Sequence, residues 1–350
     1  MTKVKKNNFI ELMRFVFAMI IFMHHSGFLV ANDSEYPFKA AGFYAVEFFF
    51  ILTGALAMRR ISRNEDKSDY MAYSMKYTIN KLVRVWPYAA AGIVLSYVWY
   101  FLQVAPGTSI HDRIFGRWNI IFELLFLPMT GVMDTSLIMY LNTPLWYLSV
   151  LLVALPLVMF LALRFKDFFG WYLCWVLPLM LHAFLIQRYG AIGNWGVYTG
   201  FLYSGLIRGL ADLMLGCFVY RLSLWIQNSL KMPKWMISII EIAAYVFAIY
   251  TFSSNVDGYS YEFAVLFMAV GMSISLSGQS ITEVLGFDSI MGHLGALSLP
   301  IYCLHWPVYR FITLYLSGIG YWMGVLISLI ICIVLSEALM LLVKRIPGKV

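Results

Sequence analysis

Charged side chains are scarce in this chain of 350 residues. Asp, Glu, Lys and Arg together make up 12% of it, whereas soluble globular domains hold about 25%. This shortage excludes an ordinary soluble domain, because too few polar groups remain to cover an apolar core. Apolar residues instead account for 61% of the chain, and the mean hydropathy is +0.77. The composition predicts an all-α, polytopic membrane protein embedded in a lipid bilayer.

Cysteine is rare as well, and its positions form no motif. The cysteines lie in apolar segments without a CxxC pair or a metal-ligand spacing, so we predict neither a disulfide nor a metal site. The four residues are Cys174, Cys217, Cys303 and Cys332.

The sequence also lacks internal repeats, low-complexity tracts and any polar segment long enough for a separate soluble domain. No small-residue cleavage site follows the first apolar stretch, which we therefore interpret as a retained span and not as a secretory signal. These absences predict a single transmembrane domain over residues 1–350. A reaction would then have to take place within the helix bundle itself.

Long apolar segments are what the sequence has in quantity. Windows of about 20 residues predict ten membrane spans. Their approximate ranges are 9–30, 42–58, 86–104, 145–163, 170–188, 200–221, 236–252, 261–277, 298–317 and 321–343. With the N-terminus inside, most of the 25 Lys and Arg residues fall on the cytoplasmic side, as the positive-inside rule requires. We therefore expect both termini in the cytoplasm and a multi-pass protein of a bacterial plasma membrane.

The net charge of +7 follows mainly from this topology and indicates no nucleic-acid partner. Two loops are long. Residues 59–84 hold seven basic side chains, and we expect an amphipathic helix on the inner membrane surface there; a basic anchor without a ligand is the alternative. Residues 105–144 contain the short apolar piece NIIFELLFLP, which is too short to span and favours a re-entrant or interfacial segment.

The first predicted span contains two ionisable side chains, Arg14 and His25, within FIELMRFVFAMIIFMHHSG. A charged residue inside a bilayer costs several kcal/mol, so its presence indicates a function. Eleven residues at about 100° each return to nearly the same helix face, with about 16 Å between the two groups. This spacing predicts a site that runs lengthwise through the bundle.

Six strings in order resemble the hallmarks of acyltransferase family 3, a family of membrane proteins that O-acylate extracellular and lipid-linked glycans. The resemblance covers Phe9 to about Phe311. The strings are FIELMRFVFAMIIFMHHSG, EFFFILTGALAMRR, KLVRVWP, TPLWYLSVLLV, IRGLADLMLG and SLPIYCLHWPV. Family positions fall on Arg14, His25, Glu47, Arg84 and His305. The resemblance implies an O-acetyltransferase that moves an acetyl group from cytoplasmic acetyl-CoA to a hydroxyl of an extracytoplasmic or lipid-linked sugar.

The chain is similar to the compact members of that family, without a fused extracytoplasmic domain. One departure follows the LWYL string, where many polysaccharide-modifying relatives have a glutamate. Val150 and Leu151 stand in this region here. The departure leaves the nearest subgroup and the identity of the acceptor open.

The chemistry expected of such a site requires a base for the acceptor hydroxyl. Histidine, with a pKa near 6.5 in its unperturbed state, is the usual base at neutral pH, and we predict that His25 has this role. Glu47 has a matching depth in the second span, so we predict that its carboxylate orients His25. We expect the adjacent His24 to contact the acceptor or the carbonyl. A histidine that only hydrogen-bonds between helices is the alternative.

Basic residues near the cytoplasmic end of the bundle predict the donor site. Arg14, Arg59, Arg60 and Arg84 are the candidates for binding the CoA phosphates, and the extended pantetheine arm would then reach His25. Arg14 also has a structural interpretation as an ion pair with Glu11, three residues earlier. Snorkelling to the membrane surface explains Arg84 almost equally well.

The remaining intramembrane polar residues have less specific interpretations. We expect Arg208 and Asp212, four residues apart, to pair on one helix face, with a substrate role as the alternative. His305 lies between two prolines, and we predict that it lines an acyl or acceptor tunnel with Tyr302 and Trp146. Arg310 is a candidate for binding an anionic acceptor group, such as a lipid pyrophosphate, or is a bare membrane anchor. The other histidines, namely His111, His182 and His293, are interpreted as ordinary.

Two functions from different classes fit these features. The first is the acyl-CoA-dependent O-acyltransferase. The second is a transporter or flippase in which Arg14, His25, Arg208 and Asp212 line a substrate or proton path. Transporters usually contain two related halves, and the early Arg14 and His25 pair has no later copy, which favours the enzyme.

Overall fold

The computed structural model describes residues 7–30, 42–63, 69–132, 140–254, 256–284 and 286–345. Within these ranges the chain is almost entirely helical and contains no β-strand. The ten long helices are α1 (Asn8–His24), α2 (Ala45–Ser62), α3 (Tyr70–Gln103), α6 (Trp146–Phe168), α7 (Cys174–Tyr189), α8 (Ser204–Ser229), α9 (Lys234–Phe252), α10 (Gly258–Ser277), α11 (Asp288–Tyr315) and α12 (Tyr321–Lys344). Each of the ten predicted spans lies on one of them.

Within the described ranges, eight helical runs are long and apolar enough to cross a membrane. One of these runs, Thr143–Tyr189, contains both α6 and α7. The chain reverses between these two helices after Lys166, whose backbone is not helical (φ 45°, ψ −113°). The 28-residue helix α11 is not among the eight runs, and it contains Pro300 and Pro307. The polytopic helical fold predicted from the sequence is therefore confirmed.

Several helices begin at a capping side chain, which satisfies backbone N–H groups that have no partner in the first turn. Asn7 accepts a hydrogen bond from the Ile10 N–H at the start of α1. Asp69 does the same for Ala72 at the start of α3, and Asp257 for Ser260 at the start of α10. These local signals set where three of the helices begin.

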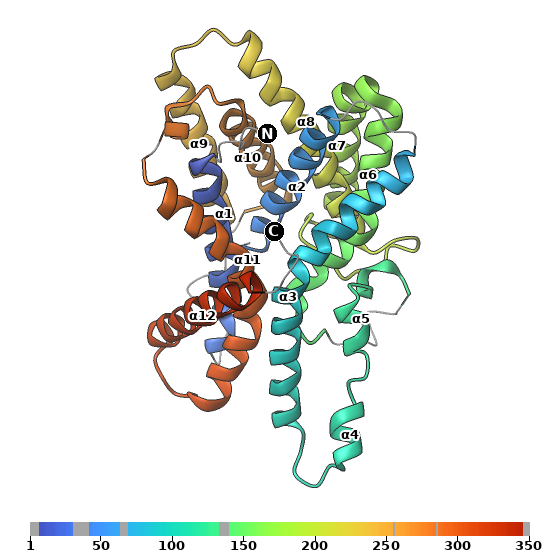
Figure 1. Ribbon diagram of the computed structural model, residues 1–350, viewed down its shortest axis with the longest axis vertical. Helices are drawn as coiled ribbons and strands as arrows, with labels where there is room; N and C mark the ends of the chain where they lie inside the picture. The colour runs from blue at the N-terminus through green and yellow to red at the C-terminus, as the bar shows by residue number, and fades with distance from the viewer. Residues whose placement is uncertain are drawn as a thin grey trace.

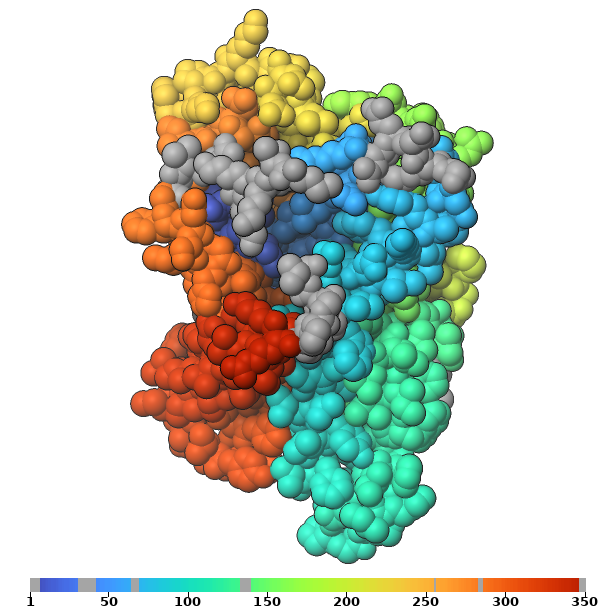
Figure 2. Space-filling model, in the orientation of Figure 1, coloured from blue at the N-terminus to red at the C-terminus, as the bar shows by residue number. Residues whose placement is uncertain are grey.

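The helices form two groups that meet along α1, α2 and α11 (Figure 1). Helix α1 packs against α11 and α2, and α2 packs closely on α8. Helices α9 and α10 pack on each other, while α12 packs mainly on α11. In Figure 2 the region of α4 (Ile110–Phe115) extends below the other helices, and Figure 1 shows α5 (Ile120–Leu124) above it, beside α3. Because α1 lies where the groups meet, its polar residues face other helices.

The long basic loop differs from its prediction in one respect. The amphipathic helix expected within residues 59–84 is the first part of α3, which continues as a single helix into the third span. Helix α3 bends along its length (Figure 1) and contains Pro87, a residue type that commonly bends helices. Its apolar stripe is exposed, at Met71, Met75, Ile79 and Val83. Residues 64–68 of this loop lie outside the described residues. An exposed apolar stripe at i, i+4 spacing is typical of a helix that lies against lipid.

The apolar piece within residues 105–144 forms the five-residue helix α5 and does not span the bundle. The indole N–H of Trp86 donates to the carbonyl of Leu124 and holds α5 beside α3. The Glu123 carboxylate accepts hydrogen bonds from the backbone N–H groups of Leu141 and Asn142. Burial raises the pKa of Glu123 to about 7 in spite of these bonds. Residues 133–139 of this loop lie outside the described residues.

Close packing of α2 on α8 depends on two glycines. A Cβ atom at Gly54 would lie 2.0 Å from the carbonyl oxygen of Leu213, and one at Gly216 would lie 2.1 Å from that of Ile51. Both neighbours are backbone atoms, which cannot rotate away. Small residues allow membrane helices to approach this closely.

Gly54→Ala is therefore expected to lower the free energy of unfolding by about 1–3 kcal/mol, the usual cost of overpacking. Denaturation of the purified protein in mixed detergent micelles would measure the change. Gly292→Ala is the matched control, because a Cβ at this helical position of α11 meets no atom within 4 Å. Equal stability of the Gly54 variant and the wild type would contradict the observed backbone contact.

Candidate active site

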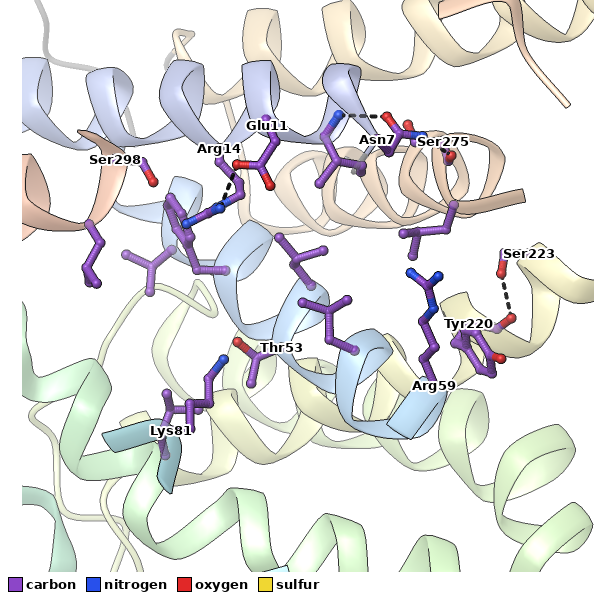
Figure 3. Close-up of a pocket in the computed structure, with 18 of the residues that line it drawn as sticks. Asn7, Glu11, Arg14, Thr53, Arg59, Lys81, Tyr220, Ser223, Ser275 and Ser298 are labelled. Atoms are coloured by element: carbon purple, nitrogen blue, oxygen red, sulfur yellow. Dashed lines mark hydrogen bonds and ion pairs between the residues drawn. The ribbon is translucent and has the colours of Figure 1, made fainter. Parts of the chain in front are cut away.

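A cavity of about 720 Å³ lies between α1, α2, α3, α6, α8, α10 and α11 at the end of the bundle where α1 begins. We call it the basic cavity. Four basic side chains line it, and Figure 3 shows Arg14, Arg59 and Lys81 directed into it from three different helices. Arg63 is the fourth. Arg14 and Arg59, which were both predicted to bind the donor, therefore line one common cavity.

Two predicted donor-binding residues, Arg60 and Arg84, do not line the basic cavity. Both are exposed on the surfaces of α2 and α3. Arg63 and Lys81 line the cavity instead. The reason is helical rotation, because Arg63 is four residues from Arg59 and shares its face, whereas Arg60 is turned away by about 100°. The segments named from the sequence do border the basic cavity, but the residues that line it are Arg63 and Lys81 and not Arg60 and Arg84.

The ion pair expected between Arg14 and Glu11 is present, with 2.7 Å between Nη1 and Oε2. Both residues also line the basic cavity, so the structural and the ligand-facing interpretations of Arg14 hold together. Glu11 offsets only one of the four positive charges. The cavity therefore carries a clear excess of positive charge, which favours a polyanionic ligand.

A second cavity of about 360 Å³ lies towards the other end of α1 and contains His25; we call it the histidine cavity. Three of the predicted site residues, His24, Trp146 and Tyr302, line it together with Arg208 and most of the segment 191–197. Val46 and Tyr302 line both cavities. The two cavities therefore share a wall, and they lie in sequence along α1 as the spacing of Arg14 and His25 predicts.

His25 is paired with a second histidine. Its Nδ1 lies 3.1 Å from Nε2 of His305 and 3.0 Å from the carbonyl oxygen of Ile21. His305, which was predicted to line a tunnel, is fully buried against His25 and does not line either of the two cavities. The two residues are 280 positions apart, and no local pattern connects them.

The hydrogen bonds of this pair assign its protons. Nδ1 of His305 lies 3.2 Å from the carbonyl oxygen of Ile301; a carbonyl only accepts, so Nδ1 holds the proton and Nε2 of neutral His305 accepts. His25 must then donate from Nδ1. The other nitrogen of His25, Nε2, is left with a lone pair. A histidine held in this tautomer on the wall of a cavity can act as a general base.

Glu47 does not orient His25, contrary to the prediction. Its carboxylate forms a bidentate ion pair with Arg208, at 2.7 Å from Nε and 2.5 Å from Nη2. Both side chains are fully buried. Arg208 also donates to the carbonyl oxygens of Gly193 and Phe43, which border the histidine cavity. The pair therefore joins α2 and α8 to two segments of the cavity wall.

Asp212 is likewise not the partner of Arg208. It lies 3.4 Å from Nε2 of His182, whose Nδ1 is 2.9 Å from Glu262. His182 was interpreted as ordinary, but it is fully buried between two carboxylates from α8 and α10. The only sequence signal for this cluster is the general rule that an intramembrane carboxylate needs a partner. That rule does not say which residue the partner is.

Aromatic rings cover much of the histidine cavity. The indoles of Trp146 and Trp195 are stacked with 5.8 Å between ring centroids and 11° between planes, and both line the cavity. The guanidinium of Arg208 lies 5.3 Å from the Trp146 ring. Trp195 was not among the predicted site residues, because it lies in a loop without an apolar pattern.

Arg310 borders neither cavity. Its guanidinium lies among the rings of Phe28, Trp99 and Trp306, and Trp306 also contacts His25. Within the part of the chain that the structure describes, no group of three or more His, Cys, Asp or Glu side chains is placed to hold a metal ion.

With this geometry in view, the family of the chain can be assigned from its sequence. Residues 7–342 match the family model of the acyltransferase domain of acyltransferase family 3. The chain belongs to acyltransferase family 3. This match confirms the predicted resemblance and extends it to nearly the whole chain. No curated protein and no solved structure matches the chain. The protein is therefore a multi-pass membrane acyltransferase with two cavities along its first helix.

Proposed function

We propose that this acyltransferase transfers an acetyl group from cytoplasmic acetyl-CoA to a hydroxyl of an extracytoplasmic or lipid-linked sugar. In this proposal both termini face the cytoplasm of a bacterial cell, so that the basic cavity opens inward and the histidine cavity lies towards the outer face. The observation that carries the proposal is the wall shared by the two cavities at Val46 and Tyr302. A donor bound in one cavity needs to pass only this wall to reach an acceptor in the other.

The basic cavity has the charge and the shape expected for CoA. Arg14, Arg59, Arg63 and Lys81 supply positive groups for the phosphates. The pantetheine arm is a thin, extended chain, and it would pass between Val46 and Tyr302 with the thioester at its tip. The axial distance of about 16 Å between Arg14 and His25 is of the order of the length of that arm.

His25 is the proposed base. Its Nε2 takes the proton from the acceptor hydroxyl as the oxygen attacks the thioester carbonyl. The C–S bond then breaks, and the proton passes from His25 to the CoA thiolate. During this step the Nδ1–H of His25 stays hydrogen-bonded to Ile21 and His305, which stabilises the imidazolium and holds the ring in place. The acetyl group moves directly, so no acyl-enzyme is required.

Aromatic rings in the histidine cavity support a sugar as the acceptor. Phe43, Trp146, Trp195 and Tyr302 line this cavity. Aromatic faces offer flat apolar area that matches the C–H face of a pyranose ring, and the polar tips of Trp and Tyr can hydrogen-bond to its hydroxyls. His24 is the proposed acceptor contact beside the base.

An assay of the purified protein in lipid nanodiscs tests this proposal. The protein is supplied with acetyl-CoA that carries a labelled acetyl group and with envelope glycans from a host that lacks the enzyme. We expect release of free CoA and transfer of the label to the glycan, with the modified sugar identified by mass spectrometry. A transporter or flippase would leave the thioester intact. Absence of turnover with acetyl-CoA, in protein that binds glycan, would overturn the proposed donor.

Lys81→Met provides a test of the donor site alone. This substitution removes one charged contact to a phosphate and keeps the side-chain volume. We therefore expect KM for acetyl-CoA to rise by about tenfold. The turnover number should change little, because Lys81 lies far from His25. Arg84→Met is the matched control on the same helix and is expected to leave KM unchanged, since Arg84 is exposed outside the cavity. An equal rise of KM in both variants would instead indicate a general effect of surface charge.

A further inference from the structure

Arg310 of α11 is held in a cage of aromatic rings near the catalytic histidine. The carbon at the centre of its guanidinium lies 4.3 Å from the centroid of Phe28, 4.9 Å from that of Trp99 and 5.3 Å from that of Trp306. The three rings come from η1 (His25–Leu29), α3 and α11. A cation in such a cage is bound by the electron-rich ring faces. The rings shield part of the charge from water, since Arg310 is half-buried and its Nε is fully buried.

This guanidinium has no anionic partner among the described residues. It forms no ion pair there, and its buried Nε–H has no hydrogen-bond acceptor. The indole N–H of Trp99, in the same cage, is also buried without an acceptor. A buried donor without a partner is unfavourable, because it has lost its hydrogen bonds to water and gained none in the protein. Two such donors beside one partly shielded cation point to a ligand that brings oxygen atoms and negative charge.

The position of the cage relates this ligand to the reaction. The indole of Trp306 contacts both groups, with 5.3 Å from its centroid to the Arg310 guanidinium carbon and 5.3 Å to the centroid of the His25 imidazole. The cage and the proposed base are therefore next to the same ring. A sugar can span such a distance, because an anomeric phosphate or a carboxylate is separated from the hydroxyls on the far side of the pyranose by the width of the ring.

We infer that Arg310 and Trp99 bind an oxyanion of the acceptor, either a phosphate at its anomeric carbon or a uronate carboxylate, while a hydroxyl of the same sugar lies at His25. This inference rests on the proposed function and adds the charge of the acceptor to it. The guanidinium suits both oxyanions, because its planar fork forms paired hydrogen bonds with either. The cage also explains why Arg310 is retained beside apolar rings at some distance from both cavities.

Binding of three defined probes to the purified protein in nanodiscs tests the inference. The probes are glucose 1-phosphate, glucuronic acid and neutral methyl glucoside, and tryptophan fluorescence with isothermal titration reports their affinity. We expect at least one charged probe to bind about tenfold or more tightly than methyl glucoside. Preference for the phosphate would indicate a sugar phosphate or a lipid-linked acceptor, and preference for the carboxylate would indicate a uronate.

Variants separate recognition of charge from support of the fold. Arg310→Gln is expected to abolish the preference for the charged probe, while Arg310→Lys keeps part of it. Trp99→Phe retains an aromatic ring but removes the N–H. We expect this variant to bind the charged probe several-fold more weakly and to bind methyl glucoside with unchanged affinity. Arg188→Gln is the matched control, because it removes the charge of an exposed arginine at the end of α7.

Equal affinity for charged and neutral probes in the wild type would overturn the inference. An equal loss of affinity for charged and neutral probes in Arg310→Gln and Trp99→Phe would also overturn it, because damage to the fold weakens the binding of every ligand alike. These measurements require neither acetyl-CoA nor turnover. Failure of the proposed donor and failure of the charged acceptor site are therefore distinguishable.

Discussion

His25→Ala is expected to lower the turnover number for acetyl transfer by about 10²–10⁴, the usual contribution of a positioned general base. The variant removes the imidazole from the wall of the histidine cavity, while the basic cavity keeps all four positive groups. KM for acetyl-CoA should therefore stay near its wild-type value. Initial rates of CoA release with saturating glycan, together with acetyl-CoA titration, would measure both quantities.

Two further histidines provide the comparisons. His305→Ala is expected to slow transfer less than His25→Ala, because His305 acts on the acceptor only through its hydrogen bond to His25. His293→Ala should keep the wild-type rate, because His293 is exposed and paired with Glu337 of α12, outside both cavities. If His25→Ala transferred acetyl groups at the wild-type rate with unchanged helical content, His25 would not be the base.

Glu47→Ala is expected to reduce the free energy of unfolding by about 3–5 kcal/mol. Both members of the Glu47 and Arg208 pair are fully buried, so loss of the carboxylate leaves a guanidinium charge inside the bundle without its bidentate partner. The same pair holds the backbone at Phe43 and Gly193. The acceptor should therefore bind more weakly as well. Chemical unfolding in mixed micelles and acceptor KM are the two measurements.

A double variant distinguishes an unpaired charge from simple loss of packing. The double variant Glu47→Ala with Arg208→Met removes both charges. We expect it to lose less free energy of unfolding than the sum of the losses in the two single variants. Asp167→Ala, which breaks the exposed pair with Arg221 at 2.8 Å, should cost less than about 1 kcal/mol and serves as the control. Strict additivity at Glu47 and Arg208 would contradict a coupled ion pair.

The helices were predictable because membrane insertion depends on contiguous sequence. A span needs about 20 apolar residues in succession, and this requirement located all ten long helices. Contacts along one helix were predictable for the same reason. The pair of Glu11 and Arg14 is separated by three residues, and the shared face of Arg14 and His25 follows from helical geometry alone.

Contacts between helices were not predictable in this way. Glu47 and Arg208 are 161 residues apart, and His25 and His305 are 280 residues apart. Two nearby carboxylates, Glu47 and Asp212, were each assigned to the wrong partner, although the need of each for a partner was recognised. Choosing the partner requires the rotation of each helix about its axis, and apolar composition does not encode that rotation when lipid and protein surfaces are equally apolar.

The sequence by itself determined that this protein is a helical membrane acyltransferase, with a basic group and a histidine placed at different depths on one helix. Only the tertiary structure decided that Lys81 and Arg63 belong to the basic cavity, that His305 holds the tautomer of His25, and that Glu47 braces Arg208. The physical reason is that hydrophobicity and helical spacing act within one segment. Buried polar partners are selected by how separate helices cross and pack.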